Sequence, residues 1–330
     1  MLDFIPAIPS PYFEIFLLPL ALWLLYFSSK VLIECALTIG EKLNLSELFI
    51  GLTLIAWVTS LPEIFVMINS IVLLNNDAPS AIYGTILGSN LANLSLVLGL
   101  GVLLSGKHFL AQAVNLRSRF IIILIATLCL VGYPLIESNS SYLPALLSLA
   151  MAVSIIFYIF ICYKQPSVIA PEEIGAKNRS LFNAVFYLFG AILAIWFATL
   201  MITTLGVEAI KFLGWSSIQT GAIFFALCTS APEIVTSLVA ILKFKKSELV
   251  LGNVIGSNIA NIFAFGLISF FWSLDISPIK NVVITGVLLI VAEITTFVLC
   301  FYYLKNNQVK IPYWNGLSLI VIYYVFVRII

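Results

Sequence analysis

A polar motif that occurs twice inside apolar sequence restricts this chain more than any other feature. Residues 59–64 read TSLPEI, and residues 229–234 read TSAPEI. A second motif follows each copy, since residues 88–93 read GSNLAN and residues 256–261 read GSNIAN. A proline, a carboxylate and paired amides are costly in an apolar environment. Two copies of such a motif therefore predict one shared site for something small and charged.

The composition is that of an integral membrane protein. Hydrophobic residues make up 62% of the 330 residues and charged residues only 9%, whereas soluble domains carry about 25% charged residues. The net charge of +1 argues against a nucleic-acid partner. The five cysteines are scattered, which argues against a disulfide framework or a thiolate metal site. We expect the lipid bilayer as the surrounding medium and no cofactor.

Apolar length divides the chain into ten transmembrane spans, since a helix needs about 20 apolar residues to cross the bilayer. The spans are expected near 14–40, 46–74, 79–104, 118–136, 142–163, 181–212, 217–243, 247–272, 279–304 and 311–329. The first five spans form a repeat over 1–163 and the last five a repeat over 181–330, joined by a cytoplasmic linker at 164–180. The repeat motifs fall within 51–95 and 221–263.

Basic residues predict that both termini are external, because Lys and Arg concentrate in cytoplasmic turns. With that orientation the external face keeps only three basic residues, Lys211, Lys280 and Arg328. The cytoplasmic turns receive twelve: Lys42, Lys107, Arg117, Arg119, Lys164, Lys177, Arg179, Lys243, Lys245, Lys246, Lys305 and Lys310.

The two motif copies are inverted relative to each other. Glu63 belongs to span 2 and Glu233 to span 7, which is five spans further along the chain, so these two spans cross the membrane in opposite directions. Inverted repeats with a substrate site at the midplane are a recurrent architecture of secondary transporters. The predicted fold is an all-α integral membrane protein with two inverted five-helix repeats.

The polar residues of four spans lie at one depth. Glu63 and Glu233 are near the middle of spans 2 and 7, each directly after a proline, Pro62 or Pro232. A charged side chain costs about 2.5–3.5 kcal/mol at that depth on insertion scales, and a proline frees backbone carbonyls that persist only around a cavity or within protein. The amides near the centres of spans 3 and 8 are Asn90, Asn93, Asn258 and Asn261. We expect broken helices 2, 3, 7 and 8 around an all-oxygen site, which suits Ca²⁺ or Na⁺.

Glycines in the second motif predict close helix packing. Gly84 and Gly88 are spaced four apart, as are Gly252 and Gly256, a spacing typical of small-residue helix contacts in membranes. Such contacts would let spans 3 and 8 approach the broken helices and bring the serine and asparagine side chains to the same cavity.

At these residues the chain resembles the cation/Ca²⁺ exchanger superfamily, and in particular its sodium/calcium exchanger branch of prokaryotic type. The resemblance rests on TS-x-PE followed by GSN-x-x-N, found twice, and it covers nearly the whole chain. It implies a secondary active antiporter, not an enzyme, that exchanges Ca²⁺ for Na⁺ by alternating access. In this family spans 1 and 6 slide across the remaining bundle.

The resemblance also implies the ion ligands. The carboxylates of Glu63 and Glu233 would hold calcium together with backbone oxygens of Thr59 and Thr229. One flanking sodium site would use Ala56, Thr59, Glu63 and Ser89, and its inverted counterpart would use Ala226, Thr229, Glu233 and Ser257. Around the middle of the cluster would lie Asn93, Asn261, Ser60 and Ser230.

One departure from the family pattern bears on the coupling ion. Many relatives have an aspartate where this chain has Asn261, which leaves two acids in place of three. Proton-coupled calcium exchangers typically have Glu at the positions of Ser89 and Ser257, so they fit less well. Exchange of Ca²⁺ for H⁺, or of another cation such as Li⁺, Mg²⁺ or K⁺, remains the alternative on the same scaffold.

Other functions fit the chain less well. An intramembrane enzyme with Glu63 and Glu233 as an acid/base pair is disfavoured, because the repeats make the two carboxylates equivalent, and a passive channel would carry far larger currents. Glu293 in span 9 has no repeat counterpart and is interpreted as a satisfied buried acid, with a proton relay as the alternative. The short chain favours a prokaryotic plasma membrane protein that functions as a monomer.

Overall fold

The computed structural model describes residues 11–330, except 44, 46, 74–77, 106–108, 113–115, 137–141, 164–179, 214–221, 224–225, 273, 275, 277–279, 303, 306–307 and 330. The helices of the first half are α1 (Pro11–Leu43), α2 (Glu47–Ile50), α3 (Ala56–Thr59), α4 (Leu61–Leu73), α5 (Ala78–Ala92), α6 (Leu98–Leu104), α7 (Leu116–Gly132) and α8 (Leu143–Tyr163). Those of the second half are α9 (Leu181–Leu213), α11 (Ala226–Thr229), α12 (Ala231–Leu242), α13 (Ser247–Trp272), α14 (Lys280–Tyr302) and α15 (Asn315–Ile329).

The described helices account for the ten predicted spans. Five of them are long and apolar enough to cross a membrane, and one bent pair, 51–59 with 61–68, meets the same criteria when it is counted as one span. Four shorter apolar helices occupy the places of spans 4, 7, 9 and 10. Of the predicted linker at 164–180, residues 164–179 lie outside the described residues.

Spans 2 and 7 are broken as predicted, but span 8 is not. Span 2 bends by 42° between α3 and α4, and α11 and α12 are likewise separate helices on either side of Ser230. Span 8 is the single continuous helix α13, and span 3 carries a π-helical turn, Asn93–Val97, between α5 and α6. The expectation of breaks in spans 3 and 8 is therefore corrected: neither has a proline at its centre to remove a backbone donor.

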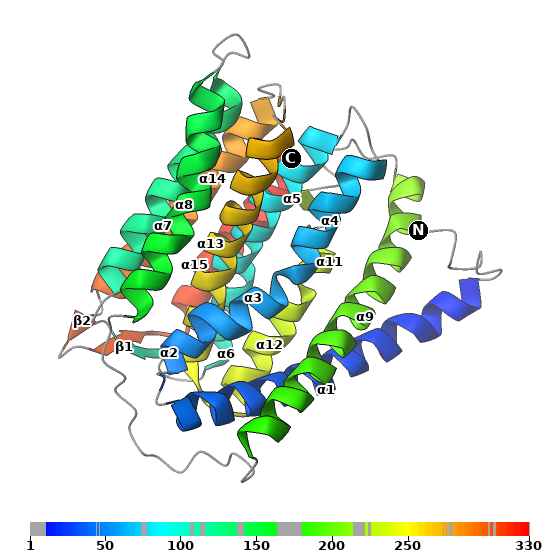
Figure 1. The fold of residues 1–330 in the computed structure, drawn as a ribbon, viewed down its shortest axis with the longest axis vertical. Helices are drawn as coiled ribbons and strands as arrows, with labels where there is room; N and C mark the ends of the chain where they lie inside the picture. The colour runs from blue at the N-terminus through cyan, green and yellow to red at the C-terminus, as the bar shows by residue number, and fades with distance from the viewer. Residues whose placement is uncertain are drawn as a thin grey trace.

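Two long helices, α1 and α9, run side by side along one side of the bundle (Figure 1). Both contain 33 residues, and α1 also contacts α12. The outer surface of α9 is strongly apolar, with Phe182, Phe186 and Phe189 largely exposed. Exposed phenylalanines on a span-length helix match contact with acyl chains.

The centre of the bundle is formed by α5 and α13, which are buried almost throughout. Glycines allow this packing, as the sequence predicted. A Cβ at Gly88 would collide with the backbone of Ala222, and a Cβ at Gly256 would collide with the backbone of Leu52. Leu52 and Ala222 stand at equivalent positions, each seven residues before the motif threonine. The same close contact is thus made twice, once by each repeat.

A small antiparallel sheet, which the sequence did not predict, joins two turns. Strand β1 (Phe109–Gln112) pairs with β3 (Gln308–Ile311), and β3 pairs with β2 (Leu304–Lys305), in the order β1-β3-β2. The turn after α6 and the turn after α14 therefore lie on the same side of the bundle, as the predicted spans require.

Arg119 differs from its expected setting in a cytoplasmic turn. It lies inside α7 and is only 1% exposed. The described side chains leave its Nε and Nη1 without a hydrogen-bond partner.

Candidate cation-binding site

Glu63 and Glu233 follow the two helix breaks in the same local geometry. Ser60 has φ and ψ of −84° and −1°, and Ser230 has −78° and 1°. Each glutamate then lies in the first turn of the second half-helix, α4 or α12. The positive end of each half-helix dipole thus faces the same region as the carboxylates.

The motif serines bond to the glutamate of the other repeat. Ser-x-x-Glu is a common helix-capping pattern, yet Ser230 makes no capping hydrogen bond. Its hydroxyl donates to Oε1 of Glu63 at 3.4 Å, and the hydroxyl of Ser60 donates to Oε1 of Glu233 at 3.4 Å. These crossed bonds connect the two repeats directly at their two carboxylates.

The serines of the second motif each donate a hydrogen bond to the glutamate of their own repeat. Ser89 donates to Oε1 of Glu63 at 3.0 Å, and Ser257 donates to Oε1 of Glu233 at 3.4 Å. The hydroxyls of Ser89 and Ser230 are also 3.0 Å apart. Both glutamates are fully buried, so each is held by one hydroxyl from its own repeat and by others from the opposite repeat.

The structure groups the threonines and alanines differently from the sets that the family resemblance implied. Ser257 lies 3.4 Å from the carbonyl of Ala56 and 3.5 Å from the hydroxyl of Thr59. Thr59 also interacts with Glu233, and Thr229 with Glu63. These contacts place Ala56 and Thr59 beside Ser257 and Glu233. The contacts join residues from opposite repeats because the broken helix of one repeat packs against the unbroken helix of the other.

The equivalent asparagines Asn261 and Asn93 differ in their hydrogen bonds. Nδ2 of Asn261 donates to Oγ of Ser89 at 3.2 Å and to Oδ1 of Asn90 at 3.0 Å. Asn93 is fully buried at the start of the π-helical turn, and neither atom of its amide has a hydrogen-bond partner. The two residues are repeat equivalents, so the site is not fully symmetric.

Several buried acceptor oxygens at this centre lack a donor. They are Oε2 of Glu63, Oε2 of Glu233, and Oδ1 of Asn93, Asn258 and Asn261. A buried acceptor without a partner is destabilising. A desolvated cation would satisfy such oxygens, because Ca²⁺ and Na⁺ prefer carboxylate, carbonyl and hydroxyl ligands. The residues present therefore fit a hard cation.

Softer metals have no comparable site in the described part of the chain. There, no group of three or more His, Cys, Asp or Glu side chains converges. Among the described cysteines, Cys129 and Cys228 form no disulfide. The geometry is therefore that of an oxygen site.

Sequence reasoning missed one residue next to the site. Thr59 donates to Oδ1 of Asn253 at 3.1 Å, and Nδ2 of Asn253 donates to Ser237 at 3.2 Å. The signal was available, since Asn253 precedes Ser257 by four residues and shares its helix face. Its repeat equivalent, Thr85, bonds instead to the carbonyl of Ala81 in its own helix.

Two inverted repeats around a shared buried polar site define a secondary transporter. The comparison with protein families agrees: the model described as "Sodium/calcium exchanger protein" matches residues 13–164 and 182–330. The chain therefore belongs to the sodium/calcium exchanger family. Members of this family are transporters, and membership supports antiport of cations such as Ca²⁺ as the activity of this chain.

Individual relatives support the same family. The chain is 30% identical over 312 residues to the membrane protein MJ0091 of Methanocaldococcus jannaschii, which covers 92% of this chain and 93% of that protein. It is 40% identical over 89 residues to the sodium/calcium exchanger MaX1 of Methanosarcina acetivorans, 27% of this chain and 25% of that one. A structure of the sodium-calcium exchanger NCX_Mj soaked with Na⁺ and Sr²⁺ shares the fold, with a TM-score of 0.75 at 24% identity over 97% of this chain and 99% of that chain.

Proposed function

We propose that this protein is a secondary active antiporter that exchanges Ca²⁺ for Na⁺ by alternating access. One observation carries the proposal: two fully buried carboxylates from opposite repeats are joined by crossed serine hydroxyls, and each keeps one oxygen without a donor. The names of NCX_Mj and MaX1 as sodium/calcium exchangers support the choice of ions.

The proposed calcium ligands are the carboxylates of Glu63 and Glu233 with the backbone carbonyls of Thr59 and Thr229. Pro62 and Pro232 have no N–H group, so they leave carbonyls of the preceding turn without their usual helical donors. Such carbonyls and carboxylates together supply the all-oxygen shell that calcium requires.

The proposed sodium sites combine residues of both repeats. One would use the carbonyl of Ala56 with Thr59, Ser257 and Glu233, because Ser257 contacts the other three. By repeat symmetry the second would use Ala226, Thr229, Ser89 and Glu63. Asn93 and Asn261 would border the cluster, and Ser60 and Ser230 would bridge its two halves.

The charges explain why exchange would be coupled. Two carboxylates neutralise one Ca²⁺ or two Na⁺, so the two ions compete and bind exclusively. With no cation bound, two buried carboxylates repel each other and lack solvation, which disfavours movement of the empty site across the membrane. Antiport requires that the two ions bind exclusively and that the site does not cross the membrane empty.

The helices α1 and α9 are the proposed moving elements. They pack mainly against each other, and α1 meets α12 beside the site. A hydrogen bond of 3.1 Å from Thr236 of α12 to Ser29 of α1 lies in that contact. Movement of the pair over α12 and its equivalent α4 would open the site to one side at a time.

A second candidate is exchange of Ca²⁺ for H⁺ or for another cation such as Li⁺, Mg²⁺ or K⁺. The observation that favours it is Asn261, which leaves two carboxylates at the centre of the site. Serines at positions 89 and 257 favour sodium, since both bond to a glutamate and add a neutral oxygen rather than a proton carrier.

The test is calcium flux in proteoliposomes that contain the purified full chain. An outward sodium gradient should drive ⁴⁵Ca uptake, and Glu63→Gln or Glu233→Gln should abolish it, because each removes one of the two charges. Glu41→Gln, at an exposed position on α1, is the matched control and should transport normally. Normal flux in either site variant would contradict the assignment, and uptake that follows a pH gradient without sodium would favour the second candidate.

Location and assembly are part of the same proposal. The orientation is the one with both termini external, in a prokaryotic plasma membrane, with the repeats 1–163 and 181–330 joined on the cytoplasmic side. A monomer suffices, since both carboxylates and all bridging serines come from one chain.

A further inference from the structure

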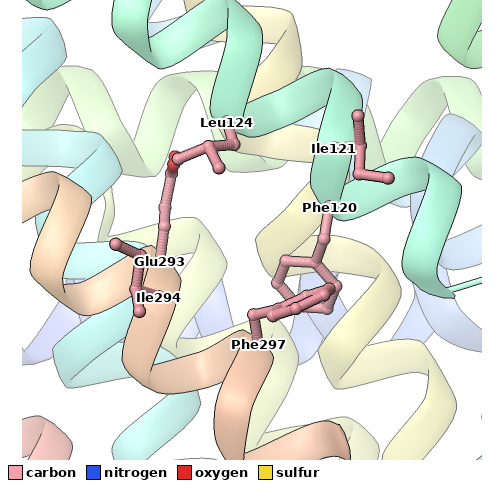
Figure 2. Close-up of a pocket in the computed structure, with 6 residues that line it drawn as sticks. All are labelled: Phe120, Ile121, Leu124, Glu293, Ile294 and Phe297. Carbon is pink, nitrogen blue, oxygen red and sulfur yellow. The ribbon is translucent and has the colours of Figure 1, made fainter.

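A second buried carboxylate lies outside the exchanger site, between α7 and α14. Glu293 is near the middle of α14 and is 2% exposed. Its side chain reaches across to α7 (Figure 2), where Thr127 donates to Oε1 at 2.5 Å. Its other oxygen, Oε2, has no hydrogen-bond donor. The sequence-based interpretation of a satisfied acid therefore holds for one oxygen only.

Glu293 borders a pocket whose lining is almost wholly apolar. The lining residues are Phe120, Ile121, Leu124, Glu293, Ile294 and Phe297. Figure 2 shows the carboxylate on one side beside Leu124 and the rings of Phe120 and Phe297 on the other. These rings form an edge-on pair with centroids 5.5 Å apart. The volume of about 60 Å³ has room for a small polar head group and its first methylene groups.

The pocket opens on the outer surface of the bundle. Ile121 and Ile294 are each 48% exposed, whereas Phe120 is buried. Because these helices are membrane spans, that surface faces acyl chains. An occupant would therefore enter sideways from the bilayer and keep its hydrocarbon part there.

From this arrangement we infer that the pocket binds amphiphilic amines, meaning a primary ammonium group on a hydrocarbon chain. The ammonium group would donate to Oε2 of Glu293, where a charge-assisted hydrogen bond is strong. None of the described residues that line the pocket is basic. A phosphate next to the amine would have no partner among them, so the inference is restricted to amines without phosphate. The site is separate from the proposed cation site and does not depend on it.

The test is photolabelling of the purified full chain in nanodiscs. The probe is a long-chain primary alkylamine that carries a diazirine, and the control probe is the alcohol of the same chain. We expect saturable amine labelling on α7 and α14, mapped by peptide mass spectrometry, and at least about tenfold lower labelling in Glu293→Gln, the usual size of a lost charged hydrogen bond. Calcium flux of that variant reports that it is folded.

Two further variants keep the test decisive. Ile294→Trp should reduce labelling by filling the entrance while leaving the carboxylate in place, and Thr127→Val should retain it because Oε2 is untouched. Equal labelling by amine and alcohol, or unchanged labelling in both Glu293→Gln and Ile294→Trp, would overturn the inference. Loss of labelling in nanodiscs rich in phosphatidylethanolamine would overturn the restriction to phosphate-free amines.

Discussion

The side-chain amide of Asn90 donates to the backbone carbonyl of Asn258 at 3.3 Å, and the amide of Asn258 donates to the carbonyl of Asn90 at 3.0 Å. The two residues are repeat equivalents on α5 and α13, and both are fully buried. This reciprocal pair ties the central helices together at the level of the site, next to Ser89 and Ser257. The symmetry of the molecule is thus expressed as a direct contact between equivalent residues.

The pair should stabilise the fold. Asn258→Leu keeps the approximate size of the side chain but removes the donor to Asn90, so we expect a lower melting temperature from a loss of about 0.5–2 kcal/mol, typical of hydrogen bonds between membrane helices. Asn183→Leu, at an exposed position on α9, is the control. Equal melting temperatures for the two variants would show that the reciprocal pair contributes nothing.

The two packing glycines should be intolerant of a methyl group. Gly88→Ala and Gly256→Ala each place a Cβ against backbone of the opposite repeat, and overpacking of this kind typically costs about 1–3 kcal/mol. We expect lower thermal stability and reduced calcium flux in both variants.

Gly190 provides the matched comparison for the packing glycines. A Cβ there has no neighbour within 4 Å, so Gly190→Ala should melt and transport like the parent protein. If all three alanine variants behave alike, the close approach of the repeats is not what requires glycine.

Asn261 should determine how much total positive charge the site binds. Asn261→Asp adds a third carboxylate beside Ser89 and replaces a donor to Oδ1 of Asn90 with an acceptor. Neutralising the added charge requires a further monovalent cation, so the sodium dependence of calcium flux should become steeper. The measurement is initial ⁴⁵Ca flux against sodium concentration. A slope identical to that of the parent would place Asn261 outside the ion cluster.

The contact between α1 and α12 should slow the proposed sliding step. Ser29 and Thr236 are both buried, and their 3.1 Å hydrogen bond would have to break as α1 moves. Ser29→Ala or Thr236→Val should raise the maximal exchange rate by roughly two- to threefold, the kinetic equivalent of about 0.6 kcal/mol. The double variant should be no faster than either single one. Effects that multiply would mean that the two side chains act independently.

Thiol labelling in whole cells would test the orientation. Tyr142 is 88% exposed between α7 and α8, and Lys245 is exposed between α12 and α13. A membrane-impermeant maleimide should label Tyr142→Cys in intact cells, and Lys245→Cys only after permeabilisation. Both variants are made in a background in which the five native cysteines are replaced by serine, since Cys129 is only partly buried. The reverse pattern would invert the proposed topology.

Local sequence was sufficient for most of the fold. Apolar length predicts the spans, because each must match the bilayer, and the motif prolines predict the breaks at Ser60 and Ser230, because a proline cannot donate a backbone hydrogen bond. It was insufficient for α13, which stays continuous although it carries the same kind of polar motif. The small sheet was also missed, because strands of two to four residues leave no periodic pattern.

The hydrogen-bond partners of the two glutamates could not be predicted from local sequence. The sequence identified Glu63 and Glu233 as a pair, since both lie at one depth after equivalent prolines. It could not assign their partners: Ser60 and Glu63 have the spacing of a helix cap, yet Ser60 bonds to Glu233. Partners of this kind depend on how two distant helices pack.

The amino-acid sequence by itself determined the membrane spans, their inversion and the residues that carry charge, because bilayer thickness and backbone chemistry act on each segment separately. Only the tertiary structure decided which hydroxyl bonds to which carboxylate and that Asn253 bonds to Thr59 beside the site. It also decided that Glu293 borders a pocket open to the lipid. These features join residues far apart in the chain, and at the centre of the bundle glycines let the two repeats pack backbone against backbone.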